Sequence, residues 1–343
     1  MNQPLDPSSP AARHDAFLLD LDGVVFRGST PIPGASAAVS RLRECGPVRF
    51  VTNNASRTPD QVAQHLARLG VGAVAAEVST AAQAAVARLA ERVGPGRGRP
   101  VLVVGGDGLA AALIGAGFEP VRSATQRPIA VVQGFAVDTT WADLAEAAYA
   151  LADGVVWIAS NLDSTLPTDR GQAPGNGALV AALVTATGRR PESTGKPDAA
   201  ILGVALAGTN ASSPVMVGDR LDTDVAAAAA AGVAAAVVLT GVTRPLDVCR
   251  APDGIRPTYV LDDVSGLLRP YVPADPRPGQ VLGVGCGGWQ FVREGANVVV
   301  GGEGPAIEGV RGLVALAWAA ADRHEPLAEP SLAAAVEVVR AAG

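Results

Sequence analysis

The chain is poor in the residues that would place it in a disulfide-rich, zinc-binding or membrane class. Its three cysteines, Cys45, Cys249 and Cys286, lie far apart and show no paired spacing, which indicates neither a disulfide framework nor a zinc site. We therefore expect free thiols in a reducing compartment. No apolar stretch has the length and hydrophobicity of a membrane span, and residues 1–15 lack the apolar segment of a signal peptide. The sequence predicts a cytoplasmic protein that does not enter a membrane.

Charged residues are also few. Asp, Glu, Lys and Arg make up 17% of the 343 residues, against about 25% in a typical globular protein. The net charge is −6, and no acidic or basic run of five or more residues occurs. Nucleic-acid binding requires a basic stripe, so this composition argues against nucleic acid as a partner. With 48% apolar residues, the chain is long and hydrophobic enough for two or three folded domains.

What the chain does contain is an alternation of short apolar runs and helical patterns, which predicts an α/β fold. The first run, Ala16 to Leu19, has no polar alternation and suits a strand covered on both faces of a parallel sheet. It stops at Asp20, and Asp22 and Gly23 follow. Open α/β sheets bind ligands at the carboxyl ends of their strands, so the two acids lie where a site is expected.

Polar side chains also follow two further predicted strands, 48–51 and 215–217, at the point where each strand ends. These side chains are Thr52, Asn53 and Asn54 in one group and Asp219, Asp222 and Asp224 in the other. Lys196 lies between the groups and precedes a predicted helix. If the strands are neighbours in one sheet, both groups and Lys196 converge on its edge. Several carboxylates share a small space only with a cation between them, and hard oxygen ligands point to Mg²⁺.

Four ordered motifs carry a family resemblance. They are Asp20-Leu21-Asp22-Gly23-Val24, Thr52-Asn53-Asn54, Gly195-Lys196-Pro197 and Gly218-Asp219-Arg220-Leu221-Asp222-Thr223-Asp224. In this order, with a long insertion between the second and third, they resemble the haloacid dehalogenase (HAD) superfamily in its NagD-like phosphatase branch. One motif alone is compatible with plain turn or capping residues, whereas four in order are highly specific. The match covers roughly residues 14–270.

The resemblance implies a role for each acid. Asp20 would be the nucleophile that forms an aspartyl-phosphate, and Asp22 would protonate the leaving alkoxide and then activate water. Asp219 would bind Mg²⁺ together with Asp20 and the backbone carbonyl of Asp22. Asp224 would not be a direct ligand but would accept a hydrogen bond from a metal-bound water. An acid two residues after the nucleophile fits phosphatases and phosphomutases, because dehalogenation has no leaving alkoxide to protonate.

The other motif residues would contact the substrate. Thr52 and Asn53 would donate hydrogen bonds to the phosphoryl oxygens, with Asn54 grouped beside them as substrate-binding. Lys196 would be catalytic, stabilising the charge on both phosphate and nucleophile. Within the insertion, a polar loop holds two more expected substrate-binding residues, Asn161 and Asp163, and the loop 170–177 is a further candidate. For Arg220 and Asp222 we expect surface roles.

The insertion, at about residues 79–192, resembles the α/β cap of this branch, which closes over the site and favours small substrates. Its few aromatic residues mostly fall in patterns typical of core, so no stacking clamp for a base or a pyridoxal ring is evident. We therefore expect glycerol phosphate or phosphoglycolate as substrate, with a nucleotide monophosphate or pyridoxal phosphate as the alternative. A second class of function is a ligand-sensing regulatory protein with a vestigial core, and the intact acids argue against it.

We therefore expect the chain to consist of three parts. Residues 14–78 and 193–270 would form the Rossmann-like HAD core, and residues 79–192 the cap. The segment 270–278 contains four prolines in nine residues, which is typical of a linker. Residues 271–343 would then form a small C-terminal α+β appendage with three strands followed by two helices. We favour a structural or oligomerising role for it, which leaves a homo-oligomer as one expected assembly.

Overall fold

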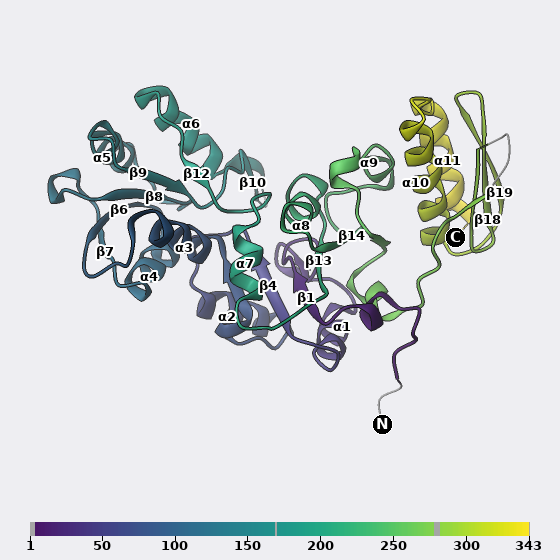
Figure 1. The fold of residues 1–343 in the computed structure, drawn as a ribbon, viewed down its shortest axis with the longest axis horizontal. Helices are drawn as coiled ribbons and strands as arrows, with labels where there is room; N and C mark the ends of the chain where they lie inside the picture. Colours follow the sequence, from purple (N-terminus) through teal and green to yellow (C-terminus); the bar gives the residue numbers. More distant parts are fainter. Residues whose placement is uncertain (1–3, 169, 278–281, 343) are drawn as a thin grey trace.

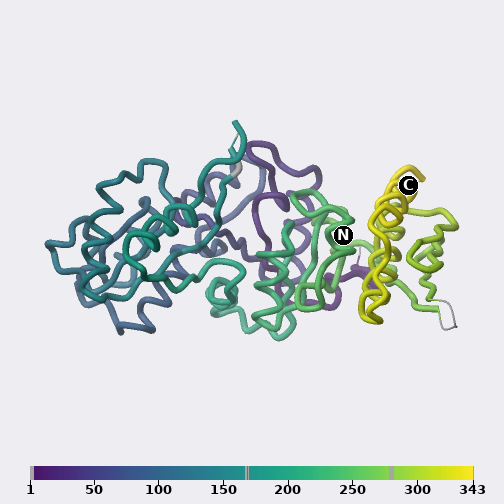
Figure 2. The backbone as a smooth tube through the Cα atoms, turned by 90° about the horizontal axis from the view of Figure 1, so that it is seen from above, coloured from purple at the N-terminus to yellow at the C-terminus, as the bar shows by residue number. Residues whose placement is uncertain are grey.

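The computed structural model describes residues 4–168, 170–277 and 282–342. Figure 1 shows three parts in a row along the longest axis, with the inserted cap at one end, the core in the middle and the C-terminal appendage at the other end. Each part has its own principal β-sheet. The view turned by 90° in Figure 2 shows the same order. The core therefore separates the cap from the appendage.

The core is built on a six-stranded sheet in the order β15-β14-β13-β1-β4-β5. Its strands are β1 Ala16–Leu19, β4 Val48–Thr52, β5 Val78–Thr80, β13 Pro214–Gly218, β14 Ala234–Val238 and β15 Tyr259–Leu261. All of their pairings are parallel. Every residue of β1 is buried, as its unbroken apolar run predicted. The predicted α/β class with a parallel core sheet is confirmed.

The position of β1 explains why the motifs converge. It lies between β13 and β4 and pairs in parallel with both. Asp20, Thr52 and Asp219 therefore stand at the carboxyl ends of three adjacent strands, at one edge of the sheet. A short antiparallel pair, β2 Phe26–Arg27 and β3 Thr30–Pro31, follows the first motif.

Helices cover both faces of the core sheet. One face packs against α1 Ala35–Leu42 and α2 Pro59–Arg68, and the other against α3 Ala81–Val93, α7 Ala200–Leu206, α8 Ala226–Ala231 and α9 Pro245–Cys249. α2 begins with a well-defined cap. Thr58 and Gln61 form a reciprocal capping box, and Pro59 occupies the first helical position, where its missing N–H costs nothing.

The cap has a parallel sheet of its own, in the order β12-β9-β8-β6-β7. Its strands are β6 Pro100–Val104, β7 Glu119–Val121, β8 Ala130–Gln133, β9 Val156–Ala159 and β12 Glu192–Ser193. Its helices are α4 Asp107–Gly115, α5 Trp141–Ala152 and α6 Asn176–Thr187. The cap is thus a second α/β unit, with its chain entering and leaving next to the core.

Two features of the cap differ from the sequence prediction. The polar segment between β9 and α6, expected as loops, contains an antiparallel hairpin of β10 Thr165–Thr168 and β11 Gly171–Pro174. This hairpin is largely exposed, so its strands carry no apolar alternation that a sequence pattern could detect. We expected most of the cap's aromatic residues in the core, but two of them, Trp141 and Tyr149, are 79% and 59% exposed.

The appendage is a four-stranded antiparallel sheet covered by two helices. Its elements are β16 Asp275–Arg277, β17 Gly283–Cys286, β18 Trp289–Glu294, β19 Asn297–Gly302, α10 Ala306–Asp322 and α11 Glu329–Ala342. The prediction was one strand short, because β16 lies within the proline-rich segment that we expected to be a linker. Pro276 is tolerated there since β16 is an edge strand. The first of the three expected strands corresponds to the apolar run 281–284, of which Val281 lies outside the described residues.

The appendage packs against the edge of the core next to β15. The buried side chain of Arg311 in α10 donates from Nε to the carbonyl of Val260 at 2.9 Å. Its guanidinium lies 4.0 Å from the ring centroid of Tyr271. Trp318 donates from Nε1 to the carbonyl of Val248 at 2.8 Å. These contacts make the appendage part of the packed molecule. No helix in the described part of the chain is both long enough and apolar enough to cross a membrane.

Candidate active site

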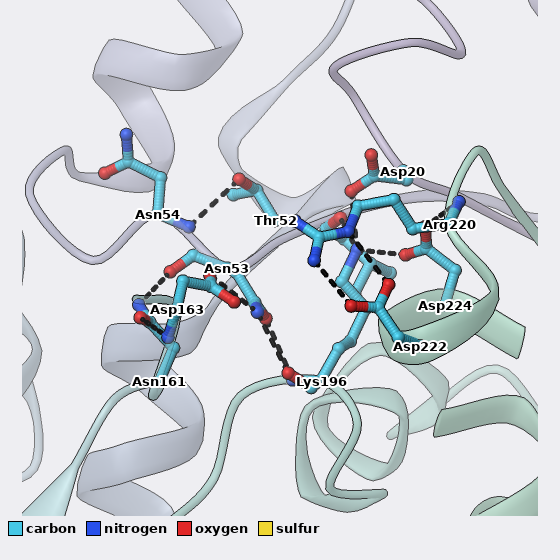
Figure 3. A network of polar contacts seen from close by, with 11 residues as sticks. Asp20, Thr52, Asn53, Asn54, Asn161, Asp163, Lys196, Arg220, Asp222 and Asp224 are labelled. Carbon is cyan, nitrogen blue, oxygen red and sulfur yellow. Dashed lines mark hydrogen bonds and ion pairs between the residues drawn. The ribbon is translucent and has the colours of Figure 1, made fainter. Parts of the chain in front are cut away.

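The predicted site residues converge where the core meets the cap (Figure 3). A cavity of about 730 Å³ opens there, which is within the usual range of small-molecule pockets, about 300 to 1,000 Å³. The cap contributes Asp163 and Thr165 to its wall, and the core contributes Lys196, Arg220 and Asp222. The cavity therefore draws polar groups from both parts of the molecule.

Three carboxylates meet beside this cavity. Asp20, Asp219 and Asp224 each place an oxygen atom within 4.8 Å of the other two. Asp219 is 4% and Asp224 2% exposed, so water does little to screen their mutual repulsion. The donor set of this group is oxygen only, without histidine or cysteine, which suits a hard cation such as Mg²⁺. The residues present thus fit the expected metal.

Lys196 already places one positive charge in this group. Its Nζ donates to Oδ1 of Asp20 at 2.5 Å, to Oδ1 of Asp224 at 2.6 Å and to the carbonyl of Val51 at 3.3 Å. Burial alone would lower the pKa of this lysine, but the two carboxylates outweigh burial and raise the pKa above its ordinary value. Lys196 is therefore a fully buried ammonium that joins the nucleophile candidate to the fourth motif.

The acids of the group have raised pKa values. Burial is the main cause for Asp20, whose pKa lies well above its ordinary value although Lys196 opposes the shift. Burial and then the nearby Asp224 raise the pKa of Asp219 to about 6, against the backbone N–H of Val242, which donates to it at 2.7 Å. Carboxylates in this condition bind protons more readily than usual, and a bound cation would displace those protons.

Two glycines make room for Asp219. A Cβ on Gly23, which has a φ of +78°, would lie 2.4 Å from Oδ2 of Asp219. A Cβ on Gly241 would lie 1.9 Å from the same atom. Gly241 and Val242 were not predicted from the sequence, because residues 239–243, which follow β14, carry no charged side chain and no motif. The one available signal was its position at the end of the strand next to β13.

Asp22 stands apart from the three grouped carboxylates. Its side chain keeps contact with solvent, and its carboxylate is not a member of the group. The protein atoms around it raise its pKa, although a hydrogen bond from the backbone N–H of Gly28 opposes the shift. The structure thus gives the two acids of the first motif different surroundings: Asp20 faces Lys196, and Asp22 faces the solvent side.

Asn53 connects three segments through its side chain. Its Oδ1 accepts the backbone N–H of Lys196 at 2.8 Å, and its Nδ2 donates to the Lys196 carbonyl at 3.1 Å and to Oδ2 of Asp163 at 3.2 Å. Both hydrogens of the amide are therefore engaged within the protein. The side-chain amide thus has no hydrogen free for a phosphoryl oxygen in this arrangement, and donation by Asn53 to the substrate stays a prediction.

Thr52 and Asn54 precede and follow Asn53 in the sequence, and their side chains have different surroundings. Thr52 is 9% exposed at the end of β4, and its Oγ1 accepts the backbone N–H of Asn54 at 3.1 Å. The Asn54 side chain is exposed, and its Oδ1 accepts the N–H and the hydroxyl of Ser56 at 2.8 and 2.7 Å. Figure 3 shows the Asn54 amide pointing away from Lys196. The structure thus brings Thr52, but not the Asn54 side chain, to the site.

The cap residues Asn161 and Asp163 have different surroundings. Asn161 is 5% exposed and donates from Nδ2 to the carbonyl of Asn53 at 2.8 Å, while its Oδ1 accepts the N–H of Asp163 at 3.1 Å. Asn176, from the second candidate loop, donates to the carbonyl of Asn161 at 2.7 Å. Asp163 reaches the cavity, and burial raises its pKa, with the hydrogen bond from Asn53 opposing. Asn161 thus holds the loop that presents Asp163.

Arg220 and Asp222 form a two-armed ion pair on the cavity wall. Nε and Nη2 of Arg220 donate to the two carboxylate oxygens of Asp222 at 3.0 and 2.7 Å, as the dashed lines in Figure 3 show. The Arg220 side chain is 39% exposed and that of Asp222 69%. We expected surface roles for both residues, yet the surface they occupy is the wall of the candidate site.

Comparison with known proteins supplies the family. A profile described as haloacid dehalogenase-like hydrolase matches residues 17–119, and a second, described as HAD-hydrolase-like, matches residues 193–267. A D-glycerol 3-phosphate phosphatase of Mycobacterium tuberculosis is 46% identical over 281 residues, which are 81% of this chain and 78% of that protein. The chain belongs to the HAD-like hydrolases. The resemblance inferred from the four motifs, including the NagD-like branch, is thereby confirmed.

Other HAD-like hydrolases resemble the chain over different lengths. The crystal structure of a glycerol phosphate phosphatase from Mycobacterium tuberculosis, in complex with magnesium, matches 91% of this chain and 92% of its own with a TM-score of 0.81 and 43% identity. A 5'-nucleotidase of Bacillus subtilis is 33% identical over 262 residues, which are 76% of this chain but 99% of that protein. About a quarter of this HAD-like chain therefore has no counterpart in the nucleotidase.

Proposed function

We propose that this HAD-like hydrolase is a Mg²⁺-dependent phosphatase that hydrolyses glycerol phosphate through an aspartyl-phosphate on Asp20. The observation that carries the proposal is the 2.5 Å contact between Lys196 Nζ and Asp20 within the carboxylate group. In this proposal the contact joins the nucleophile to a fixed positive charge and a set of metal ligands, next to the cavity that Lys196 lines. The similarity to D-glycerol 3-phosphate phosphatase and to the magnesium-bound structure supports the choice of substrate and metal.

In the first step, a carboxylate oxygen of Asp20 attacks the phosphorus atom, and the bond between phosphorus and the glycerol oxygen breaks. Asp22 gives its proton to the leaving alkoxide. Its raised pKa and its contact with solvent suit an acid that must hold a proton near neutral pH and exchange it afterwards. In the second step, Asp22 takes a proton from the water that attacks the aspartyl-phosphate, which releases inorganic phosphate and restores Asp20.

Asp20, Asp219 and the backbone carbonyl of Asp22 would hold Mg²⁺, with Asp224 holding a metal-bound water from the outside. When bound, the ion supplies positive charge that offsets the phosphoryl oxygens and the clustered carboxylates. Both oxygens of Asp224 already accept hydrogen bonds, from Lys196 Nζ and from the backbone N–H of Arg220, which suits this outer role.

Substrate contacts are divided between core and cap. Thr52 would donate its hydroxyl to a phosphoryl oxygen, and Asp163 would face the alcohol. Asn53 and Asn161 would act indirectly, without contacting the substrate, because their amides hold the Lys196 segment and the Asp163 loop. Asn54 would act only by stabilising the turn that it forms with Ser56.

The proposal also covers organisation and location. We assign residues 14–78 and 193–270 to a catalytic core, residues 79–192 to a cap that governs specificity, and residues 271–343 to an appendage with a structural role. The cytoplasm is the proposed location, which the free state of Cys45, Cys249 and Cys286 supports.

Phosphate release from a panel of phosphate monoesters tests this proposal. The panel contains glycerol 3-phosphate, nucleoside monophosphates and pyridoxal phosphate, and each is assayed with wild type and with Asp20→Asn. We expect the highest kcat/KM for glycerol 3-phosphate and no turnover by Asp20→Asn with an unchanged circular dichroism spectrum. A preference for a nucleotide would overturn the substrate. Tight binding of a ligand without any turnover would favour a regulatory protein instead.

A further inference from the structure

We propose that the cavity selects phosphate monoesters of uncharged polyhydroxy alcohols and rejects those of similar size that carry a carboxylate, and that Arg220, Asp222 and Asp163 set this choice. The inference rests on the proposed phosphatase function and narrows its substrate class. It separates glycerol phosphate from carboxylated compounds such as phosphoglycolate, which the sequence left side by side.

The first observation is that the cations of the cavity are already paired. Two of the residues described as lining it are basic, Lys196 and Arg220. Lys196 is engaged by Asp20 and Asp224 at the phosphate end. Arg220 is held by both oxygens of Asp222, and this two-armed geometry is the strongest form of arginine–carboxylate pairing. A substrate carboxylate would therefore meet an arginine whose positive charge Asp222 already offsets.

The second observation is that acids outnumber bases on the described part of this wall. Asp163, Asp198 and Asp222 all line the cavity. Asp163 projects from the cap side, where Asn53 and Asn161 fix its loop, and it interacts electrostatically with Arg220. A second anionic group on the substrate would meet these carboxylates, and such like-charge contacts are an effective means of rejecting a ligand.

The same groups suit hydroxyls. An ionised carboxylate only accepts hydrogen bonds, and an alcohol donates them, so Asp163 and Asp222 can each receive a substrate O–H. Ser164 and Thr165 add hydroxyls that both donate and accept. The wall beyond Lys196 thus offers acceptors for a polyol without offering an unpaired cation for an acid.

Two esters with the same three-carbon skeleton test the inference. Glycerol 3-phosphate ends in a hydroxymethyl group, and 3-phosphoglycerate ends in a carboxylate. We expect wild type to favour glycerol 3-phosphate in kcat/KM by at least about tenfold. Asp222→Asn releases Arg220, so kcat/KM for 3-phosphoglycerate should rise about five- to twentyfold relative to glycerol 3-phosphate. Adding Arg220→Gln to Asp222→Asn should abolish this gain, because the released cation is then missing.

Matched variants separate this pairing from a general change of charge. Asp198→Asn removes one negative charge from the same wall without touching Arg220, and it should move the ratio by less than about threefold. Asp163→Asn provides an independent variant from the cap. It should also reduce the preference for glycerol 3-phosphate over 3-phosphoglycerate. Circular dichroism spectra and urea denaturation check that each variant is folded.

The possible results distinguish this inference from the function on which it rests. A ratio that Asp222→Asn leaves unchanged, or that Asp198→Asn shifts equally, overturns the inference while Asp20-dependent hydrolysis of glycerol 3-phosphate keeps the proposed function. A wild-type preference for 3-phosphoglycerate likewise overturns the inference. Hydrolysis of neither ester by wild type overturns both.

Discussion

The backbone N–H of Lys196 donates a 2.8 Å hydrogen bond to the side chain of Asn53, and the Asn53 amide returns a 3.1 Å bond to the carbonyl of Lys196. This reciprocal pair fastens the peptide of Lys196 to the end of β4. The other hydrogen of the same amide reaches Asp163 of the cap. One side chain therefore contacts both the segment of the buried Lys196 and the loop that carries Asp163 to the cavity wall.

Replacing Asn53 with alanine should lower kcat, although its side chain does not contact Asp20 directly. The change removes three hydrogen bonds and allows the Lys196 segment to shift, and displacements of about 1 Å commonly cost around 10²-fold in rate. We expect kcat for p-nitrophenyl phosphate to fall about 10- to 100-fold. The neighbouring substitution Asn54→Ala serves as control, because it removes only a turn contact with Ser56. An equal loss in both variants would contradict the assigned roles.

Lys196→Met should affect both activity and stability. It leaves Asp20 and Asp224 buried without their shared cation, and breaking a buried ion pair commonly costs about 3–5 kcal/mol of unfolding free energy. The rate should fall by about 10²- to 10³-fold, as for other lost electrostatic donors. Urea denaturation followed by circular dichroism measures the stability. Mg²⁺ should restore more stability to this variant than to wild type, and an equal effect on both would count against clustered charge as the cause.

Binding of Mg²⁺ to the metal-free protein should weaken in acid. The pKa of Asp219 is raised to about 6, so the carboxylate is ionised above that pH and protonated below it. A proton must leave before a cation binds, and affinity should therefore fall by up to about tenfold for each pH unit below about 6. Isothermal titration calorimetry at several pH values, with Asp219→Asn as the reference, measures this. An affinity independent of pH across this range would show that Asp219 is not a ligand.

The appendage should contribute to the stability of the whole chain. Arg311→Met removes a hydrogen bond to Val260 and the contact with the Tyr271 ring, and we expect a loss of about 2–4 kcal/mol in unfolding free energy. Arg340→Met, in the last turn of α11, is the matched control, because its side chain is 64% exposed and it should change stability by less than about 0.5 kcal/mol. Equal melting temperatures for the two variants would show that Arg311 does not hold the appendage to the core.

The sequence was most informative where local chemistry and topology agree. The run before Asp20 is apolar without alternation, which suits a strand buried on both faces, and a parallel sheet brings the ends of such strands together. The cap of α2 is likewise a local feature, because Thr58, Pro59 and Gln61 act within one helical turn.

Features that depend on distant partners could not be read in this way. The amide of Asn53 binds Lys196 and Asp163, which are more than a hundred positions away in the sequence. The residues around Asn53 therefore gave no sign of these contacts. Gly241 is needed only because the Asp219 carboxylate occupies the space beside it. The hairpin of β10 and β11 is held by backbone pairing rather than by an apolar face, so the pattern of its side chains does not predict it.

The central claim is that Asp20 carries the phosphoryl group during turnover. An acyl phosphate is reduced by borohydride, which converts the aspartate that held it to homoserine. Enzyme that is turning over glycerol 3-phosphate with Mg²⁺ is quenched, reduced and digested, and the peptide spanning β1 is sequenced by mass spectrometry. Our account predicts homoserine at position 20 in wild type, and none without substrate or in Asp20→Asn. Homoserine at Asp22 or at another carboxylate, or no conversion in enzyme that is hydrolysing substrate, would contradict it.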